Sequence, residues 1–374
     1  MKIAIFLPNL TRSSGGAEVY GLYLAKALSN KHEVVIITAR PKCVDYNVKS
    51  VYKKYGISDL RTYYFNMYFE GNRSLIKEYI GERMLNFSAN RLIGLIKPDL
   101  FINGNQFKLI ARSKRNSICI SHFPPDRYHV PILKKFDSDY ANSYDLFVSN
   151  SEFGKIHLKK MYGKDAVVLY PPVIFPPIKN ELLKKKERII LAVDRFVPDK
   201  KILEMIEAYK ALPQSSRDLY KLVIIGNKDT KEEEYYNSVI HEINGFSIEI
   251  YHDLSFEELL SWYKKAMIFW HAKGYQVSDD NPKNMEHFGM TTVEAMINGC
   301  VPVVINKAGQ REIMKFGLEF LAWDDLNQFV SITNSLINDE NRIRELQPVV
   351  IEVAQRFSYR VFENKANEIV ERFE

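Results

Sequence analysis

The chain has few cysteines and no long hydrophobic run, and both absences limit the kind of protein it can be. Its 374 residues include only three cysteines, Cys43, Cys119 and Cys300, which are scattered and odd in number. They form neither a metal-binding spacing nor a disulfide framework, which is typical of a reducing cytoplasm. No apolar run reaches the roughly 18 residues of a membrane helix, and the amino terminus lacks a signal core and cleavage site. We therefore expect a cytoplasmic protein whose first residues form a buried strand.

Several sequence motifs are also missing. The chain has no GxGxxG fingerprint, which argues against a dinucleotide-dependent dehydrogenase. It has no zinc finger, no RNA-recognition signature and no long basic helix, so nucleic acid is not the expected partner.

Positive charge is in modest excess and is unevenly distributed. Lys and Arg number 52 against 46 Asp and Glu, which gives a net charge of +6. Basic patches suit phosphorylated substrates or anionic lipid headgroups, and solvated surface lysines are the alternative. The excess is concentrated in three places: Arg112, Lys114 and Arg115; Lys134 and Lys135; Lys184, Lys185 and Lys186.

The length predicts two domains, and the order of apolar segments predicts that both are α/β. In the first half, buried strands are expected at residues 2–7, 33–38, 99–103, 117–122, 146–150 and 167–169, with helices at 15–29 and 86–97. A proline-rich and then charged linker follows. In the second half, strands are expected at residues 188–193, 221–225, 248–251, 267–271 and 301–305.

Each half is therefore predicted to be a Rossmann-like, doubly wound domain, with a cleft between the two. We expect the first domain over residues 1–175 and the second over residues 176–357. The last segment, residues 358–374, is helical by its apolar period and covers its own domain or crosses back to the first.

The most informative segment is residues 284–312, which contains two glutamates, Glu286 and Glu294. Because Gly289 falls between them, we expect Glu286 in a loop and Glu294 in a helix whose N-cap is Thr291 or Thr292. The free N–H groups at such a helix start can hold a phosphate. Two acids beside a phosphate seat suggest a sugar nucleotide, although this spacing also arises by chance.

Basic residues follow the first strand of the second half. Arg195 and Lys200 stand at its carboxyl end, where open parallel sheets bind ligands. Their charges would oppose the negative charge that develops on a departing diphosphate. The alternative is an exposed basic turn.

Three features of the first half are weaker. Gly15 and Gly16 precede the first helix and allow close approach of a ligand, or form only a turn. His122 ends a strand and is either structural or a polar group near a reacting centre. Residues 61–69 are strongly aromatic, which indicates core packing or, alternatively, an acceptor groove or membrane contact.

Together these segments resemble the retaining glycosyltransferases of family 4, which have the GT-B fold. The resemblance rests on GGAE at residues 15–18, VSNSEF at 148–153, YPPV at 170–173, DRFVPDK at 194–200 and EHFGMTTVEAMINGCVPVV at 286–304. The last of these is a close match to the family's E-x7-E segment. FSYRVFENK at 357–365 looks like the family's closing helix, which crosses between the domains. Lys201 and Ala308 depart from the family pattern, in which glycine or asparagine, and glycine, are frequent.

The resemblance implies a role for each matching residue. Glu286 would lie near the donor sugar, Glu294 would bind the ribose, and Arg195 and Lys200 would hold the diphosphate. His122 would lie by the sugar. Backbone groups complete the implied donor site, at Gly15, Gly16, Phe288, Gly289, Met290 and Thr291. Catalytic roles would fall on Glu286, His122, Arg195 and Lys200.

The implied activity is transfer of a hexosyl group from a UDP- or GDP-linked sugar to a glycan or lipid-linked acceptor, with retention and without a metal. The basic balance and the aromatic stretch suggest an acceptor at the membrane surface, and hence a peripheral contact with anionic lipid. A nucleotide-sugar 2-epimerase of the same fold, a phosphorylase and a non-catalytic sugar-nucleotide-binding module remain alternatives.

Overall fold

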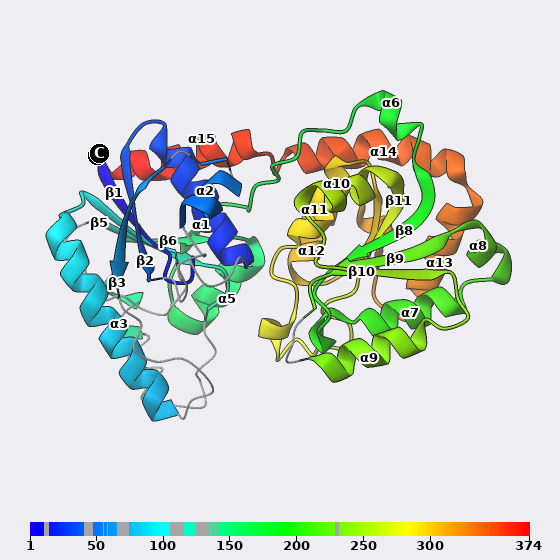
Figure 1. Cartoon of the computed structure of the whole chain (residues 1–374), viewed down its shortest axis with the longest axis horizontal. Coiled ribbons are helices and arrows are strands. Elements are labelled where there is room, and N and C mark those ends of the chain that lie inside the picture. Colours follow the sequence, from blue (N-terminus) through cyan, green and yellow to red (C-terminus); the bar gives the residue numbers. More distant parts are fainter. Residues whose placement is uncertain are drawn as a thin grey trace. The chain divides into compact units, whose positions relative to one another are not determined.

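The computed structural model describes two compact units. One comprises Met1–Pro172 with Arg360–Glu374, and the other Val173–Tyr359. The described residues are 1–10, 15–40, 48–54, 56–57, 59–65, 75–104, 116–124, 135, 138–139, 141–228 and 232–374. Each unit contains one parallel sheet flanked by helices (Figure 1). The predicted class, two Rossmann-like α/β domains, is confirmed.

The sheet of the first unit has seven parallel strands in the order β3-β2-β1-β4-β5-β6-β7. Their bounds are β1 Lys2–Phe6, β2 Glu33–Ala39, β3 Arg61–Phe65, β4 Leu100–Asn103, β5 Asn116–Ser121, β6 Leu146–Ser149 and β7 Ala166–Val168. β3 is the start of the aromatic segment, whose residues 66–69 lie outside the described part. Its Phe65 is buried and packs on Phe6, so core packing is correct for this residue.

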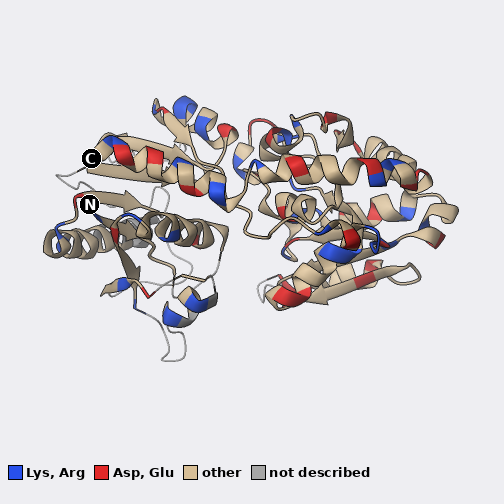
Figure 2. Ribbon diagram, turned by 90° about the horizontal axis from the view of Figure 1, so that it is seen from above, with Lys and Arg blue, Asp and Glu red and all other residues tan. Residues whose placement is uncertain are grey.

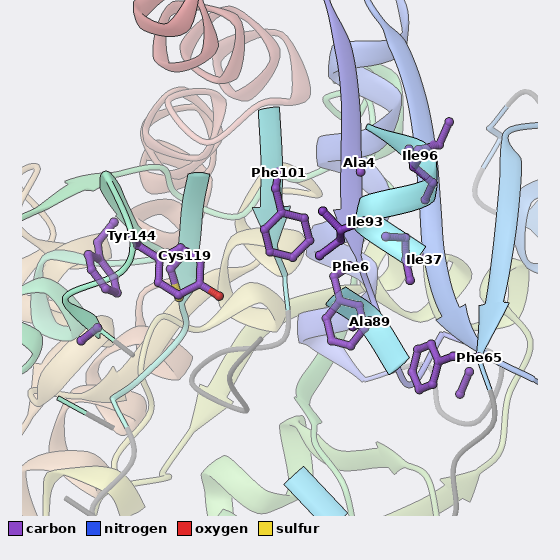
Figure 3. Packing of buried hydrophobic residues seen from close by; sticks show 14 of the residues in the cluster. Ala4, Phe6, Ile37, Phe65, Ala89, Ile93, Ile96, Phe101, Cys119 and Tyr144 are labelled. Carbon is purple, nitrogen blue, oxygen red and sulfur yellow. The ribbon is translucent and has the colours of Figure 1, made fainter. Parts of the chain in front are cut away.

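Helices α1 Gly16–Ser29, α2 Val48–Lys54, α3 Leu75–Ile96, α5 Glu152–Tyr162 and α15 Tyr359–Val370 accompany this sheet. Between α3 and the sheet, the side chains of Phe6, Phe101, Ala89 and Ile93 form a dense apolar core (Figure 3). The last helix, α15, packs against α1. Phe362 meets the ring of Tyr20 edge to face, with centroids 5.4 Å apart.

The sheet of the second unit has six parallel strands in the order β10-β9-β8-β11-β12-β13. Their bounds are β8 Glu187–Val193, β9 Lys221–Gly226, β10 Ile248–His252, β11 Ala266–His271, β12 Val301–Ile305 and β13 Ala322–Trp323. The helices are α6 Asn180–Leu183, α7 Ile202–Ala211, α8 Gln214–Leu219, α9 Glu233–Glu242, α10 Phe256–Lys265, α11 Met290–Ile297, α12 Ala308–Met314, α13 Leu326–Asn338 and α14 Glu340–Gln355.

The predicted basic clusters have different outcomes. Lys184 and Lys185 are exposed, but Lys186 is 6% exposed and belongs to the interior, so its assignment to a surface cluster was wrong. The cluster at residues 112–115, and residue 134 of the cluster at 134–135, lie outside the described residues. Elsewhere, basic and acidic residues are interspersed along the helices of both units (Figure 2).

Two further sequence features can be placed within the described part of the chain. Cys119 and Cys300 are free and buried, whereas Cys43 lies outside that part. No helix of the same residues combines the length and hydrophobicity needed to span a bilayer.

Candidate functional site

Two neighbouring strands of the second unit end at the point where its strand order reverses. The chain runs from β8 outward to β9 and β10, and then returns to place β11 on the other side of β8. Asp194 directly follows β8, and His271 is the last residue of β11. Open α/β sheets bind ligands at such switch points, because the loops that leave the two strands diverge there.

Lys200 brings two carboxylates together at this edge. It ends the short 3-10 helix η1, Pro198–Lys200, and its side chain is only 11% exposed. Its Nζ lies 2.6 Å from Asp194 Oδ1 and 3.0 Å from Glu286 Oε2. Burial lowers the pKa of Lys200, but the two carboxylates raise it by more, so the net pKa is above its usual value. Lys200 therefore remains a cation.

Glu286 lies in a loop, as predicted. Its side chain is 19% exposed, so it is largely enclosed but still reachable. Burial raises the pKa of Glu286, but Lys200 and His271 together lower it by more, and the net pKa lies well below its usual value. The carboxylate is therefore ionised at any working pH.

His271 is the fourth member of this buried group. It is 1% exposed, and its Nε2 lies 3.4 Å from Glu286 Oε2 and 3.6 Å from Asp194 Oδ2. The shorter distance is compatible with a weak hydrogen bond to Glu286, whereas the longer one is not. Among the described residues, His271 Nδ1 has no hydrogen-bond partner. We refer to Asp194, Lys200, His271 and Glu286 as the charge cluster.

Glu294 has quite different surroundings. It is the fifth residue of α11, and its Oε2 accepts a hydrogen bond of 3.0 Å from the hydroxyl of Tyr263. Burial raises the pKa of Glu294 to about 7, and the hydrogen bond from Tyr263 only partly offsets this. A substantial fraction of this carboxyl is therefore protonated at neutral pH.

Helix α11 begins earlier than predicted. Its N-cap is Gly289, not Thr291 or Thr292, and the backbone of Gly289 has φ 113°. Such a backbone is open to glycine and strained for other residues, which places the helix boundary there. Among the described residues, no group accepts a hydrogen bond from the N–H of Gly289, Met290 or Thr291. These N–H groups are therefore available to an anion.

A second glycine holds the Glu286 loop in place. Gly309 donates its N–H to the carbonyl oxygen of Glu286 at 2.9 Å. A Cβ at Gly309 would lie only 2.3–2.4 Å from backbone atoms of His287 and Phe288. The side chain of Phe288 is buried and meets Phe357 edge to face. Only glycine at position 309 permits this close approach.

Arg195 is exposed and adjoins the charge cluster in sequence. It follows Asp194, whereas the next residue, Phe196, is fully buried and packs against Tyr236 at 5.1 Å. The buried phenylalanine anchors the segment, and the arginine side chain is left to solvent. Arg195 has no ion-pair partner within the described part of the chain.

Both departures from the family pattern fall on left-handed backbone. Lys201 has φ 60° and Ala308 has φ 48°. Glycine and asparagine adopt this conformation most readily, so Lys201 and Ala308 occupy backbone that is less favourable for their side chains.

The candidate residues of the first unit lie in a different environment. Gly15 is the N-cap of α1 and Gly16 its first residue, and both are exposed. His122 directly follows β5 and is 7% exposed. Its ring meets Tyr20 of α1 edge to face at 5.1 Å.

In the second unit, the structure brings Lys200 and Glu286 into contact. Asp194, His271 and Tyr263 also contact Lys200, Glu286 and Glu294, and they are not among the predicted site residues. The available signal was position, because Asp194 follows a buried strand and His271 ends another. No cluster of three or more His, Cys, Asp or Glu side chains suited to a metal occurs among the described residues.

Comparison with known proteins assigns this second unit to a family. Residues 175–349 match the family model described as glycosyl transferases group 1. The match covers nearly the whole unit and includes every member of the charge cluster.

Two curated relatives have related names. A GDP-Man:Man(3)GlcNAc(2)-PP-Dol alpha-1,2-mannosyltransferase of Dictyostelium discoideum is 25% identical over 292 residues, which cover 71% of this chain and 52% of the relative. The chain thus spans about half the length of that protein. The second is an alpha-1,4-N-acetyl-D-galactosaminyltransferase of Campylobacter jejuni, which acts on an undecaprenol-PP-linked GalNAc-containing glycan. It is 22% identical over 277 residues, with 72% of each chain covered.

A solved structure shows the same fold over the whole chain. HepE of Anabaena, in complex with UDP and glucose, has a TM-score of 0.75 and 16% identity, and all of both chains are covered. The chain therefore has the GT-B fold. Its second unit is a domain of the group 1 glycosyltransferases.

Proposed function

We propose that this protein is a retaining glycosyltransferase of family 4. It transfers a hexosyl group from a UDP- or GDP-linked sugar to a glycan or lipid-linked acceptor. The observation that carries the proposal is the charge cluster, together with Glu294, at the switch point of a group 1 glycosyltransferase domain. Acids and cations at this edge fit a ligand with sugar hydroxyls and phosphates.

In this proposal the diphosphate binds beside Arg195, Lys200 and the start of α11. Arg195 is exposed and unpaired among the described residues, so it can turn toward a phosphate. The ammonium group of Lys200 has three N–H donors, of which Asp194 and Glu286 occupy two. The third can donate to a phosphate oxygen. The backbone N–H groups at Phe288, Gly289, Met290 and Thr291 contribute further donors.

The sugar lies beside Glu286. As the glycosidic bond to phosphate breaks, positive charge develops on the sugar and negative charge on the diphosphate. The ionised carboxylate of Glu286 stabilises the first, and Arg195 with Lys200 stabilises the second. Because these groups supply the positive field, the reaction requires no metal.

The acceptor is proposed to be a glycan carried on a lipid diphosphate. Two of the curated relatives are named for such acceptors, one linked to dolichol and one to undecaprenol. The net charge of +6 supports a peripheral contact with anionic lipid at the cytoplasmic face of a membrane. Flotation with anionic and neutral vesicles at low salt tests this contact, and failure to bind the anionic vesicles would contradict it.

A thermal-shift screen over UDP-, GDP- and ADP-sugars tests the donor class. A ligand at 100 times its dissociation constant stabilises a protein by about 2.7 kcal/mol, so a true donor is detectable. The screen is repeated with EDTA, which we expect to change nothing.

Variants at the two ends of one strand test the site. Arg195 lies beyond the carboxyl end of β8, whereas Arg188 lies near its amino end and pairs with Glu340 at 3.1 Å. We expect Arg195→Ala to weaken donor binding about tenfold to a hundredfold, because a charge-assisted hydrogen bond is lost. Arg188→Ala is the matched control and leaves donor binding unchanged. Equal effects of the two substitutions would refute the site.

Turnover separates the alternatives. Incubation with the donor alone yields a C2 epimer if the protein is an epimerase, whereas a transferase consumes donor when the acceptor is present. Binding without transfer to any lipid-linked glycan would favour a non-catalytic module. NMR of the new linkage tests retention, and an inverted anomeric configuration would contradict it.

A further inference from the structure

A buried lysine and a buried cysteine of the second unit have no role in the proposed reaction. Lys186 is 6% exposed, and its Nζ donates to the carbonyl oxygens of Tyr263, at 3.0 Å, and Ala266. Cys300 is fully buried, and its Sγ donates to the same two carbonyl oxygens at 3.1 and 3.3 Å. A buried ammonium group is unfavourable unless it is well hydrogen-bonded, so these contacts fix the backbone where α10 ends and β11 begins.

The side chain of Tyr263 extends from this fixed backbone. Tyr263 is fully buried, and its ring packs near Phe175 and Phe269, with centroid distances of 6.1 and 6.4 Å. Packed rings and a held carbonyl leave the side chain little freedom. Its hydroxyl therefore has a fixed position, at which it donates to Glu294 Oε2 at 3.0 Å.

This contact uses only one of the two carboxylate oxygens of Glu294. Its Oε1 has no hydrogen-bond partner among the described residues, and the side chain is only half-buried. A carboxylate offers about four acceptor positions, so Glu294 can accept further hydroxyl donors while Tyr263 holds one oxygen. Burial raises the pKa of Tyr263 well above its usual value, so the phenol remains a donor at any working pH.

We propose that Tyr263 is a positioning residue for the ribose of the donor. Its hydroxyl orients the Glu294 carboxylate so that the free oxygen meets the ribose hydroxyls, and Lys186 and Cys300 hold Tyr263 in register. This inference rests on the proposed function, because it requires a nucleotide at this site.

The test compares nucleotides with and without ribose hydroxyls. UDP, GDP and ADP are each titrated calorimetrically beside their 2′,3′-dideoxy forms, and the base that binds the wild-type protein best is used. We expect Tyr263→Phe to weaken binding of the ribonucleotide about tenfold, because the Glu294 carboxylate loses the hydrogen bond that orients it toward the ribose hydroxyls. We expect no change for the dideoxy form, because it has no hydroxyls for Glu294 to bind.

The matched control is another buried tyrosine with a hydrogen-bonded hydroxyl. Tyr209 is fully buried and donates to the carbonyl oxygen of Tyr220 at 2.8 Å, away from the charge cluster. Tyr209→Phe removes the same hydroxyl and leaves both affinities unchanged. A double variant provides a second arm. In a Glu294→Gln background, adding Tyr263→Phe has no further effect on ribonucleotide binding.

The outcomes separate the two proposals. If Tyr263→Phe weakens both nucleotide forms equally, its role is only structural and the inference fails. The inference also fails if ribonucleotide binding is unchanged, or if the double variant binds more weakly than Glu294→Gln alone. If the folded wild-type protein binds none of the three nucleotides, the proposed function itself fails. Loss confined to the ribonucleotide supports the inference.

Discussion

Glu286 and Glu294 are the same residue type, eight positions apart, yet one lies beside a cation and the other beside a neutral hydroxyl. The carboxylate of Glu286, in a loop, contacts the cation of Lys200 and the ring of His271. The carboxylate of Glu294, in α11, contacts only the hydroxyl of Tyr263 among the described residues. The pKa of Glu286 is therefore well below its usual value, whereas burial raises the pKa of Glu294 to about 7.

The difference separates a permanent charge from a conditional one. Glu286 is ionised before any ligand arrives, because Lys200 stabilises its charge. Glu294 has no cation beside it among the described residues, and the hydrogen bond from Tyr263 stabilises its ionised form only in part, so further stabilisation requires hydroxyl donors from a ligand. In the proposed function, Glu286 is a negative charge beside the sugar at all times, whereas Glu294 becomes fully ionised only when the ribose binds.

Removal of the Lys200 ammonium group should destabilise the protein, because it stabilises the charge of Glu286 in the loop. Lys200→Met leaves Asp194 and Glu286 close together without the ammonium group between them. We expect a loss of about 3–5 kcal/mol in the free energy of unfolding, measured by urea denaturation at pH 7. The loss should shrink as pH falls, because one carboxyl can then bind a proton.

Two further variants, a partial rescue and a control, test the effect of Lys200→Met. Asp194→Asn with Lys200→Met should recover part of the stability, since it removes one of the two charges. Lys201→Met removes the neighbouring ammonium, which pairs with Glu204 at 3.0 Å, and should cost only about 0.5 kcal/mol. Similar losses for Lys200→Met and Lys201→Met would contradict the account.

Replacement of Glu294 should change the free energy of unfolding in the opposite direction to Lys200→Met. The pKa of Glu294 is about 7 in the folded protein against an ordinary value of 4.5, so the folded state binds more protons between these values. The free energy of unfolding therefore falls as pH rises from 4.5 to 7, by up to about 3 kcal/mol, and is level above. Glu294→Gln should abolish this fall and stabilise the protein at pH 8.

Calorimetric melting of the wild-type and Glu294→Gln proteins at pH 5 and pH 8 measures the effect. We expect the melting temperatures to be similar at pH 5 and the variant to melt higher at pH 8, although it binds nucleotide more weakly. A variant that is less stable at both pH values would show that the buried, ionised carboxylate of Glu294 does not destabilise the folded protein.

A glycine substitution should disturb the loop without removing any charge. Gly309→Ala places a Cβ against the backbone of His287 and Phe288, next to Glu286. We expect a loss of about 1–3 kcal/mol from overpacking and a reduced kcat, measured by denaturation and transfer assays. Gly94→Ala is the control. Its Cβ meets nothing within 4 Å inside helix α3, so it should stabilise by about 0.5–1 kcal/mol.

The smallest expected effect comes from relief of backbone strain beside the loop. Ala308 has φ 48°, a left-handed conformation that glycine adopts without penalty. Ala308→Gly should therefore raise the free energy of unfolding by up to about 1 kcal/mol, net of the greater flexibility of the unfolded chain. Ala295→Gly, at a buried position inside α11, should instead destabilise.

Much of the fold was predictable because each strand is a buried apolar run with a clear end. Strands β8, β11 and β12 were placed within one residue or two, and so was the loop that carries Glu286. Short β13 was missed, since two residues carry no period, and α13 and α14 were not proposed. The start of α11 was also wrong, because threonine side chains predict an N-cap whereas the φ of Gly289 decides it.

The site was predictable only in part. Arg195, Lys200, Glu286 and Glu294 lie in recognisable motifs. The partners that set their charge states do not, because they are distant in sequence. Lys200 meets Glu286 across 86 residues, and Tyr263 meets Glu294 across 31. Lys186 was misjudged because its two lysine neighbours are exposed, and only the packing of its own side chain distinguishes it.

The central claim is that this edge of the second unit holds a nucleotide sugar through one fixed and one conditional acid. Proton release on binding tests it most directly. The nucleoside diphosphate sugar found by the screen is titrated calorimetrically at pH 7, in two buffers of different ionisation enthalpy. With a pKa of about 7, Glu294 should release up to about half a proton as the ribose binds, and Glu294→Gln should release none. Binding with equal proton release in both proteins, or no binding of any nucleotide sugar, would contradict the account.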